Sequence, residues 1–173
     1  MDFDNEKVRT SGIKDLLDKD LVLPYYQRQY SWTDKNVRNL LSDISNSIND
    51  KERFGASFRY RIGTIILYNN ADTGKYEIVD GQQRIITLFL LKYYLEGSYD
   101  KGCELIKNEK WLKASEKTLR HSYKIIQDWF SGRLDEKESY KDALDNILEV
   151  VIIIADDISE AFQMFDSQNS RGK

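Results

Sequence analysis

The segment with the most chemical character runs from Ile78 to Arg84 and reads IVDGQQR. A strand-like run precedes it and an apolar helical run follows, so we expect it at a strand-to-helix junction. The first backbone N–H groups of a helix lack partners within the helix, and the helix dipole favours an anion beside them. Gly81 lets a ligand approach the backbone closely. The positive charge of Arg84 is unfavourable near the positive end of the helix dipole. A bidentate contact to a bound phosphate would make this position favourable.

The same segment also fits a purely structural explanation. Asp80 could be the N-cap of the helix, with Gln83 completing a variant of the capping box three residues later. Arg84 could then pair with an acidic side chain. Spacing alone favours this explanation, because strand–glycine–helix junctions are common.

A second segment, Pro24–Trp32, reads PYYQRQYSW. If it is extended, one face carries Tyr26, Arg28, Tyr30 and Trp32, and the other carries Tyr25, Gln27, Gln29 and Ser31. Aromatic side chains interleaved with Arg and Gln can stack on bases and bond to phosphates or base edges. The alternative is that Tyr25, Tyr30 and Trp32 are core aromatics before a helix. We prefer that alternative for Trp32 and keep both interpretations for Gln27 and Arg28.

A third segment, FDSQNSRGK, covers Phe165–Lys173. Phe165 is expected to pack inward, with Asn169, Arg171 and Gly172 where the last helix ends. This pattern is typical of a helix C-terminus with a glycine cap and basic residues that complement the dipole. It also fits a loop that carries Asn169 and Arg171 to a ligand pocket.

Composition limits the chemistry available. The 173 residues carry a net charge of -3, which is the wrong sign for a whole-surface DNA binder, so phosphate binding must be local. The stretch Arg53–Arg61 is one candidate basic stripe, and a solvated loop fits it equally well. The one histidine, His121, and the one cysteine, Cys103, exclude a His- or Cys-rich metal site and an internal disulfide.

Targeting signals are absent from the sequence. The polar, acidic start MDFDNEKVRT is not a secretory signal, and the longest apolar run, Ile85–Leu95, is too short to span a membrane. The single cysteine fits a reducing compartment. We therefore expect a cytoplasmic protein without a membrane partner.

The periodicity predicts a mixed α+β domain. We expect a short helix at Ser11–Asp18, a helix capped by Thr33, and a hairpin of strands Arg61–Tyr68 and Lys75–Val79. A buried helix at Gly81–Leu95, a strand at Val150–Ile154 and a last helix from Ile158 follow. These elements form one domain over residues 1–173, a small mixed β-sheet packed with helices, with a helical insertion at about residues 98–149.

Taken together, the three segments resemble the N-terminal domain family of GmrSD-type restriction endonucleases. That family shows an extended YQR-x-Y-x-W segment, a strand with G-x-I, the sequence IVDGQQR-(L/I)-x-TL, and a distal F-x-x-x-N-x-RG. In this chain the matching residues are Tyr26–Trp32, Gly63–Ile65, Ile78–Leu88 and Phe165–Gly172.

The resemblance implies a ParB-like fold whose DGQQR loop binds, and hydrolyses, a nucleoside triphosphate. It implies a sensor domain of a modification-dependent restriction system in bacterial defence against phage, acting on DNA with modified bases or backbones. A separate C-terminal HNH-type region or partner subunit would supply DNA cleavage. No HNH signature occurs in this sequence, so we expect a fragment of a longer protein.

Carried over residue by residue, the resemblance assigns nucleotide or phosphate binding to Gly81, Gln82, Gln83, Arg84, Arg28, Asn169 and Arg171. The resemblance matches Gln27 and Arg28 to the YQR segment, and a DNA-binding hypothesis assigns DNA contacts to Tyr26, Gln27 and Arg28. In the hypothesis that follows, Arg84 neutralises the β- and γ-phosphate oxygens with help from Arg28 or Arg171. Asp80 and Arg84 are the candidate catalytic residues, with Asp80 holding Mg²⁺ or positioning water.

Two rival hypotheses remain. In one, the pocket recognises modified DNA without hydrolysis, so DNA affinity falls steeply with salt. In the other, the domain is itself a phosphodiesterase, a ParB-like DNA nuclease that uses Asp80 with a metal. We rank the nuclease last, because no second carboxylate has a clear place in the site.

Overall fold

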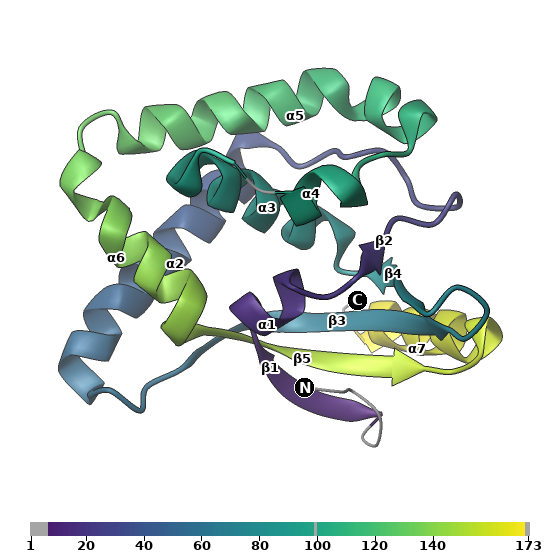
Figure 1. Ribbon diagram of the computed structural model, residues 1–173. Helices are drawn as coiled ribbons and strands as arrows, with labels where there is room; N and C mark the ends of the chain where they lie inside the picture. The colour runs from purple at the N-terminus through teal and green to yellow at the C-terminus, as the bar shows by residue number, and fades with distance from the viewer. Residues whose placement is uncertain (1–6, 99, 172–173) are drawn as a thin grey trace.

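The computed structural model describes residues 7–98 and 100–171, and a mixed sheet forms its centre (Figure 1). The strands are β1 (Val8–Gly12), β2 (Leu21–Val22), β3 (Tyr60–Asn70), β4 (Lys75–Asp80) and β5 (Leu148–Ala155). Their order across the sheet is β1-β5-β3-β4-β2. The β5/β3 and β4/β2 pairs are parallel and the other two pairs are antiparallel. The predicted α+β class with a small mixed sheet is confirmed.

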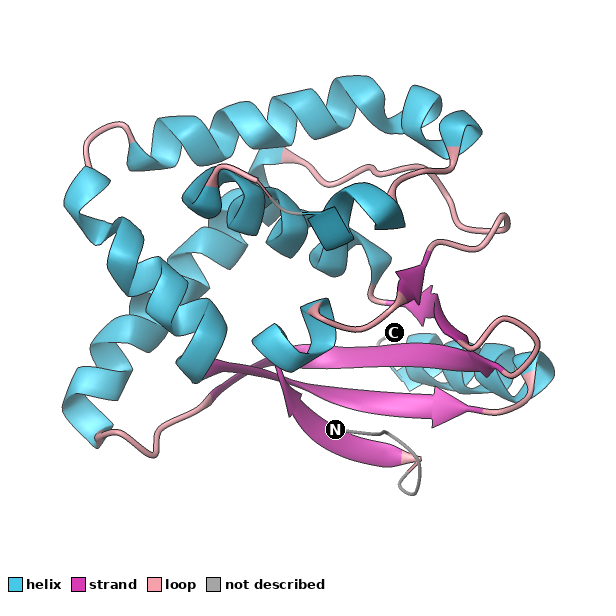
Figure 2. Ribbon diagram, viewed as in Figure 1, coloured by secondary structure: helices cyan, strands magenta, loops and turns pink. Residues whose placement is uncertain are grey.

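Helices cover both faces of this sheet. They are α1 (Ile13–Leu17), α2 (Asp34–Phe54), α3 (Gln82–Glu96), α4 (Asp100–Leu105), α5 (Glu109–Phe130), α6 (Lys137–Asp142) and α7 (Ile158–Arg171). A 3₁₀ turn at Leu134–Glu136 and a π-helical segment at Ala143–Ile147 flank α6. Figures 1 and 2 show α7 on one face of the sheet and the remaining helices on the other.

The side chains of the central strands point alternately to the two faces of the sheet, so the core consists of two hydrophobic clusters. In β3, Ile65 and Leu67 enter the large cluster under α2, α3 and α5, whereas Ile66 enters the small cluster under α7. Successive strand side chains point to opposite faces, so the stretches that are covered on both faces, Ile65–Leu67 of β3 and Val150–Ala155 of β5, are apolar at every position. The sheet therefore holds α3 on one side and α7 on the other, and both helices contribute to the pocket described below.

Most predicted elements are confirmed. Thr33 caps α2 through a reciprocal capping box with Asn36, and β3 and β4 form the predicted hairpin. The first strand, β1, was not predicted, and the predicted helix at Ser11–Asp18 begins only at Ile13. β1 pairs with β5, which lies near the other end of the chain. The short, polar sequence of β1 has no hydrophobic alternation that would have indicated a strand.

The predicted helical insertion contains α4, α5 and α6, and it packs against the rest of the fold. Trp111 Nε1 of α5 donates to the carbonyl oxygen of Arg28, and Ser115 Oγ accepts from the backbone N–H of Tyr30. The insertion thus fixes the Pro24–Trp32 segment in place. Within the described residues, no helix combines the length and apolar character needed to cross a membrane.

Candidate functional site: a pocket at the start of α3

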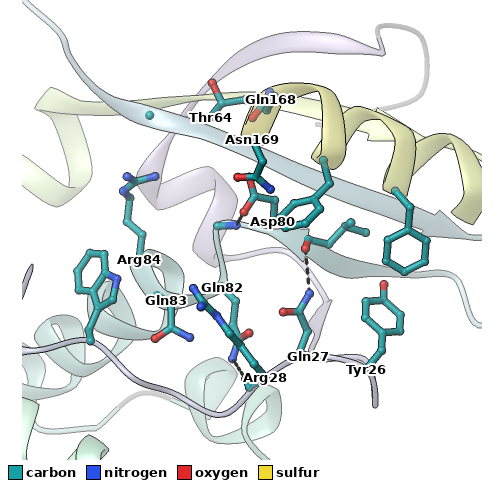
Figure 3. Close-up of a pocket in the computed structure, with 16 residues that line it drawn as sticks. Tyr26, Gln27, Arg28, Thr64, Asp80, Gln82, Gln83, Arg84, Gln168 and Asn169 are labelled. Carbon is teal, nitrogen blue, oxygen red and sulfur yellow. Dashed lines mark hydrogen bonds between the residues drawn. The ribbon is translucent and has the colours of Figure 1, made fainter. Parts of the chain in front are cut away.

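A pocket of about 850 Å³ opens where four separate segments meet (Figure 3). Its lining comes from the Pro24–Trp32 segment, the bulged start of β3, the β4–α3 junction and α7. The lining residues are Tyr26, Gln27, Arg28, Trp32, Gly63, Thr64, Val79, Asp80, Gly81, Gln82, Gln83, Arg84, Phe162, Phe165, Gln168 and Asn169. The three segments that the sequence singled out therefore converge.

The β4–α3 junction turns sharply at Gly81. This residue is the N-cap of α3, and its φ of 92° lies in the left-handed region that favours glycine. A β-carbon there would lie 2.9 Å from Cγ1 of Ile65, so the turn also packs closely against β3. Asp80 ends β4, and its Oδ1 accepts from the Gly81 backbone N–H at 2.8 Å.

The capping-box alternative for this junction is wrong. The cap residue is Gly81 rather than Asp80, and no side chain caps the helix. No described residue accepts from the backbone N–H groups of Gln82, Gln83 or Arg84, and the first such bond runs from Ile85 N to Gly81 O. The first turn of α3 therefore presents unpaired donors and the positive end of the helix dipole to the pocket.

Arg84 extends into the pocket across the bulge of β3. Gly63 sits in that bulge with φ 135°, and a β-carbon on it would lie 2.6 Å from Nη1 of Arg84. No described carboxylate lies within ion-pair distance of the guanidinium, so the proposed acidic partner for Arg84 is wrong. Burial lowers the pKa of Arg84, while the nearby charges of Asp80 and Asp43 oppose that shift. The cation is partly desolvated and makes no direct ion pair with a described residue, which suits it to bind an anion.

The Pro24–Trp32 segment does not alternate between two faces as predicted. Tyr26, Gln27 and Arg28 all line the pocket, because a turn joins Gln27 N to Pro24 O. Tyr30 is fully buried, and its hydroxyl bonds to Thr87 and Ser122 at 2.7 and 3.2 Å.

The structural explanation for the aromatic residues of this segment holds for only some of them. Tyr30 is a core residue, and Trp32 packs against the core while lining the pocket. Tyr25 is 92% exposed, so its assignment to the core is wrong.

Glutamine side chains tie this segment to the junction. Gln27 Nε2 donates to the carbonyl oxygens of Ile78 and Val79 at 2.6 and 2.9 Å. Gln82 Nε2 donates to Arg28 O at 2.9 Å. Gln83 accepts from Ser31 N at 2.8 Å and donates to Gln29 O at 3.3 Å. The DGQQR sequence therefore positions Arg28 as well as the helix start.

Aromatic side chains form another part of the lining. The rings of Tyr26 and Phe162 meet edge to face with centroids 5.1 Å apart, and Phe165 lies in the same pocket. The Tyr26 hydroxyl is buried and has no hydrogen-bond partner among the described residues. Burial raises its pKa to about 12, so the hydroxyl stays protonated near neutral pH.

Helix α7 contributes Gln168 and Asn169, and Figure 3 shows Asn169 close to Asp80. Both residues are helical, so no distal loop carries Asn169 to the pocket. Arg171 is exposed at the end of α7 and does not line the pocket; the proposed glycine cap, Gly172, falls outside the described residues.

The sequence reasoning assigned no role to Gly63, Thr64, Phe162 or Gln168, which also line the pocket. A glycine inside a strand run often marks close approach of another group, and this signal could have identified Gly63. The basic stripe Arg53–Arg61 lies at the end of α2 and the start of β3. None of its residues lines the pocket, and Arg61 pairs with Glu149 at 2.9 Å.

No group of three or more His, Cys, Asp or Glu side chains suited to a metal occurs among the described residues. Asp80 is the carboxylate in the pocket lining. One carboxylate fits Mg²⁺ only if phosphate oxygens supply other ligands, as is usual for Mg²⁺ at nucleotide sites.

The fold and pocket define an α+β domain with a pocket at the start of helix α3. Compared with known families, residues 13–173 match the family described as the GmrSD restriction endonuclease, N-terminal domain. The match covers essentially the whole chain, so the chain belongs to this family and is a domain of a restriction system. No curated protein was found to match the sequence.

Proposed function

We propose that this domain binds and hydrolyses a nucleoside triphosphate and so acts as the regulatory sensor of a DNA restriction system. The observation that carries the proposal is the unpaired guanidinium of Arg84 beside the unpaired N–H groups that begin α3. Helix N-termini with a nearby arginine are favourable phosphate sites because both groups offer only donors and positive charge. In this proposal the protein acts in the cytoplasm, and an HNH-type nuclease region or partner subunit cuts the DNA.

Arg84 and Arg28 have different parts in this proposal. Arg84 is held by its packing on Gly63 and meets the terminal phosphates. The Arg28 side chain is exposed, but its carbonyl oxygen is fixed by Gln82 and Trp111. Arg28 can therefore swing onto a bound polyphosphate while its backbone stays in place. Arg171 has no assigned part, because it lies outside the pocket lining.

Hydrolysis needs water aligned with the γ-phosphorus. Water attacks phosphorus, the bond to the β–γ bridging oxygen breaks, and the nucleoside diphosphate and phosphate leave. In this proposal Asp80 would orient that water or accept its proton, and it would give one oxygen ligand to a Mg²⁺ ion bound with the nucleotide. Positioning and charge neutralisation supply most of the rate in phosphoryl transfer, which suits a site built from arginines and backbone donors.

The test is a titration of the purified domain with each nucleoside triphosphate, with and without Mg²⁺, by calorimetry. Arg84→Ala is expected to abolish binding. Arg120→Ala is the matched control, because Arg120 is exposed on α5 and pairs there with Glu116. Equal affinity in the Arg84→Ala protein and the wild type would remove the proposed phosphate site.

DNA binding without hydrolysis is a second candidate function, favoured by the exposed Arg28 in the pocket lining and by the exposed ring of Tyr25, which contacts the ring of the lining residue Tyr26. Gln27 cannot donate to a base edge, because its amide N–H₂ group is committed to two backbone carbonyls and only its oxygen can accept. This function predicts affinity for modified DNA that falls steeply as salt rises. Binding that does not change with salt counts against it.

A further inference from the structure

Two glutamine side chains in the pocket donate from their amide nitrogen to backbone carbonyl oxygens. Gln27 Nε2 donates to the carbonyl oxygens of Ile78 and Val79, and Gln82 Nε2 donates to that of Arg28. A backbone carbonyl oxygen only accepts hydrogen bonds, so these contacts determine which end of each amide is the nitrogen. Gln27 therefore keeps only its oxygen Oε1 for a further hydrogen bond, whereas Gln82 keeps Oε1 and the second N–H of Nε2.

Neither oxygen has a donor among the described residues. Gln82 is only 4% exposed, and its Oε1 is buried without a hydrogen-bond partner. No hydrogen bond from a described residue reaches Oε1 of Gln27. The neighbouring Gln83 differs, since both ends of its amide bond to the backbone of the Pro24–Trp32 segment. A buried acceptor without a donor is unfavourable, so Gln82 Oε1 indicates a ligand that donates.

A phosphate cannot satisfy these oxygens. At neutral pH its oxygens are mainly acceptors, and bare carbonyl oxygens repel them. The donors in this pocket are elsewhere, on Arg84 and on the backbone N–H groups that begin α3. The pocket is thus divided into a donor part for an anion and an acceptor part for N–H or O–H groups. Rings of Tyr26, Phe162 and Phe165 also line it and offer surfaces for stacking.

We propose that Gln27 and Gln82 bind the nucleoside part of the ligand, through a sugar hydroxyl or an exocyclic amino group that donates to their Oε1 atoms. The base packs against Tyr26 and Phe162. This inference rests on the proposed function, because it places the phosphates at Arg84. Gln82 then meets phosphate through its backbone N–H and the nucleoside through its side chain. The terminal torsion of glutamine is broad, so a small rotation turns the enclosed oxygen toward the ligand.

The first experiment varies the ligand and leaves the protein intact. ATP, GTP, CTP, UTP and inorganic tripolyphosphate are compared by calorimetry on the wild-type domain. We expect at least one nucleotide to bind about tenfold or more tightly than tripolyphosphate, since losing a buried hydrogen bond has about that effect. Forms of the preferred nucleotide without the 2′-hydroxyl, the 3′-hydroxyl or, where the base carries one, the exocyclic amino group then identify the donor, and one deletion should remove most of the preference.

The outcomes separate this inference from the proposed function. If tripolyphosphate binds as tightly as every nucleotide, the nucleoside site is wrong and the phosphate site stands. The same conclusion follows if all the deletion analogues bind equally. If neither nucleotides nor tripolyphosphate bind, the proposed function and this inference both fail.

The second experiment compares Gln82→Met with Gln83→Met. Gln82→Met removes one hydrogen bond between α3 and the Pro24–Trp32 segment together with an unsatisfied oxygen, whereas Gln83→Met removes two such bonds and no unsatisfied oxygen. The measured quantity is the ratio of nucleotide to tripolyphosphate affinity. We expect the ratio to collapse in Gln82→Met and to persist in Gln83→Met. Equal loss of the ratio in both variants would show that the tether, not the oxygen, sets the preference.

Discussion

The guanidinium group of Arg84 lies against the main chain of Gly63, closer than a side chain at position 63 would allow. A β-carbon on Gly63 would stand 2.6 Å from Nη1 and 3.0 Å from Cζ of Arg84. Gly63 occupies the bulge in β3, where the pairing with β5 shifts register between Arg61 and Thr64. The bulge and the missing side chain together create the space in which the proposed phosphate-binding cation sits.

Gly63→Ala is therefore expected to damage the site as well as the fold. Its φ of 135° is unfavourable for alanine, which costs on the order of 1–3 kcal/mol. The new methyl group would also displace Arg84, so nucleotide affinity should fall by about tenfold or more, as for a lost charge-assisted hydrogen bond. Urea unfolding measures the first effect and calorimetric titration the second.

Gly74→Ala is the matched control for Gly63→Ala. Gly74, in the β3–β4 turn, also has positive φ, at 68°, but a β-carbon added to it would meet no atom within 4 Å. This variant should lose stability without losing nucleotide affinity. A folded Gly63→Ala protein that binds nucleotide like the Gly74→Ala protein would show that Arg84 does not depend on the bulge.

The two ends of α3 allow a second paired test. Gly81 and Gly97 both adopt left-handed backbone conformations at the caps of this helix. A β-carbon would meet Ile65 at 2.9 Å at Gly81, whereas Gly97 has open space. Gly81→Ala should therefore lower the free energy of unfolding by more than Gly97→Ala and should weaken phosphate binding, because the first turn of α3 must shift. Equal stability losses in the two variants would contradict the close packing at Gly81.

Tyr30 connects the Pro24–Trp32 segment to α3 and α5. Its buried hydroxyl bonds to Thr87 on α3 and Ser122 on α5. Tyr30→Phe should reduce the free energy of unfolding by about 1–3 kcal/mol, because buried polar partners lose their bonds. Tyr25→Phe, at a side chain that is 92% exposed, should have little effect in the same urea unfolding experiment. Similar stability of both variants would mean that the Tyr30 hydroxyl does not hold these elements together.

The Tyr26 hydroxyl provides a prediction about pH. Burial is the main cause that raises its folded pKa to about 12, above the ordinary value of 10.0. A group with a raised folded pKa adds stability that is fully present below pH 10 and is lost as the pH rises through 12. The absorbance difference at the phenolate band between wild type and Tyr26→Phe should therefore show a transition near pH 12 in the folded protein. A transition near pH 10, as in the denatured chain, would place Tyr26 in water.

Local sequence patterns determined much of this fold. Periodicity in the apolar residues predicted α2, α3, β3, β4, β5 and α7, because burial on one face or both faces dictates where apolar side chains recur. The DGQQR junction and the YQR segment were both identified as parts of one site, and they do line one pocket.

Only the tertiary structure decided which polar atoms in that pocket remain free to bind a ligand. The sequence contains three glutamines at the site, Gln27, Gln82 and Gln83. In the structure their side-chain amides make different hydrogen bonds. The structure also leaves Arg171 out of the pocket lining and brings in Gly63 and Phe162. The hydrogen bonds of the glutamines, the space beside Gly63 and the lack of an ion pair at Arg84 all have one cause. They depend on contacts between residues far apart in the chain. Such contacts have no period in the sequence, so they follow only from how the sheet, α3 and α7 pack together.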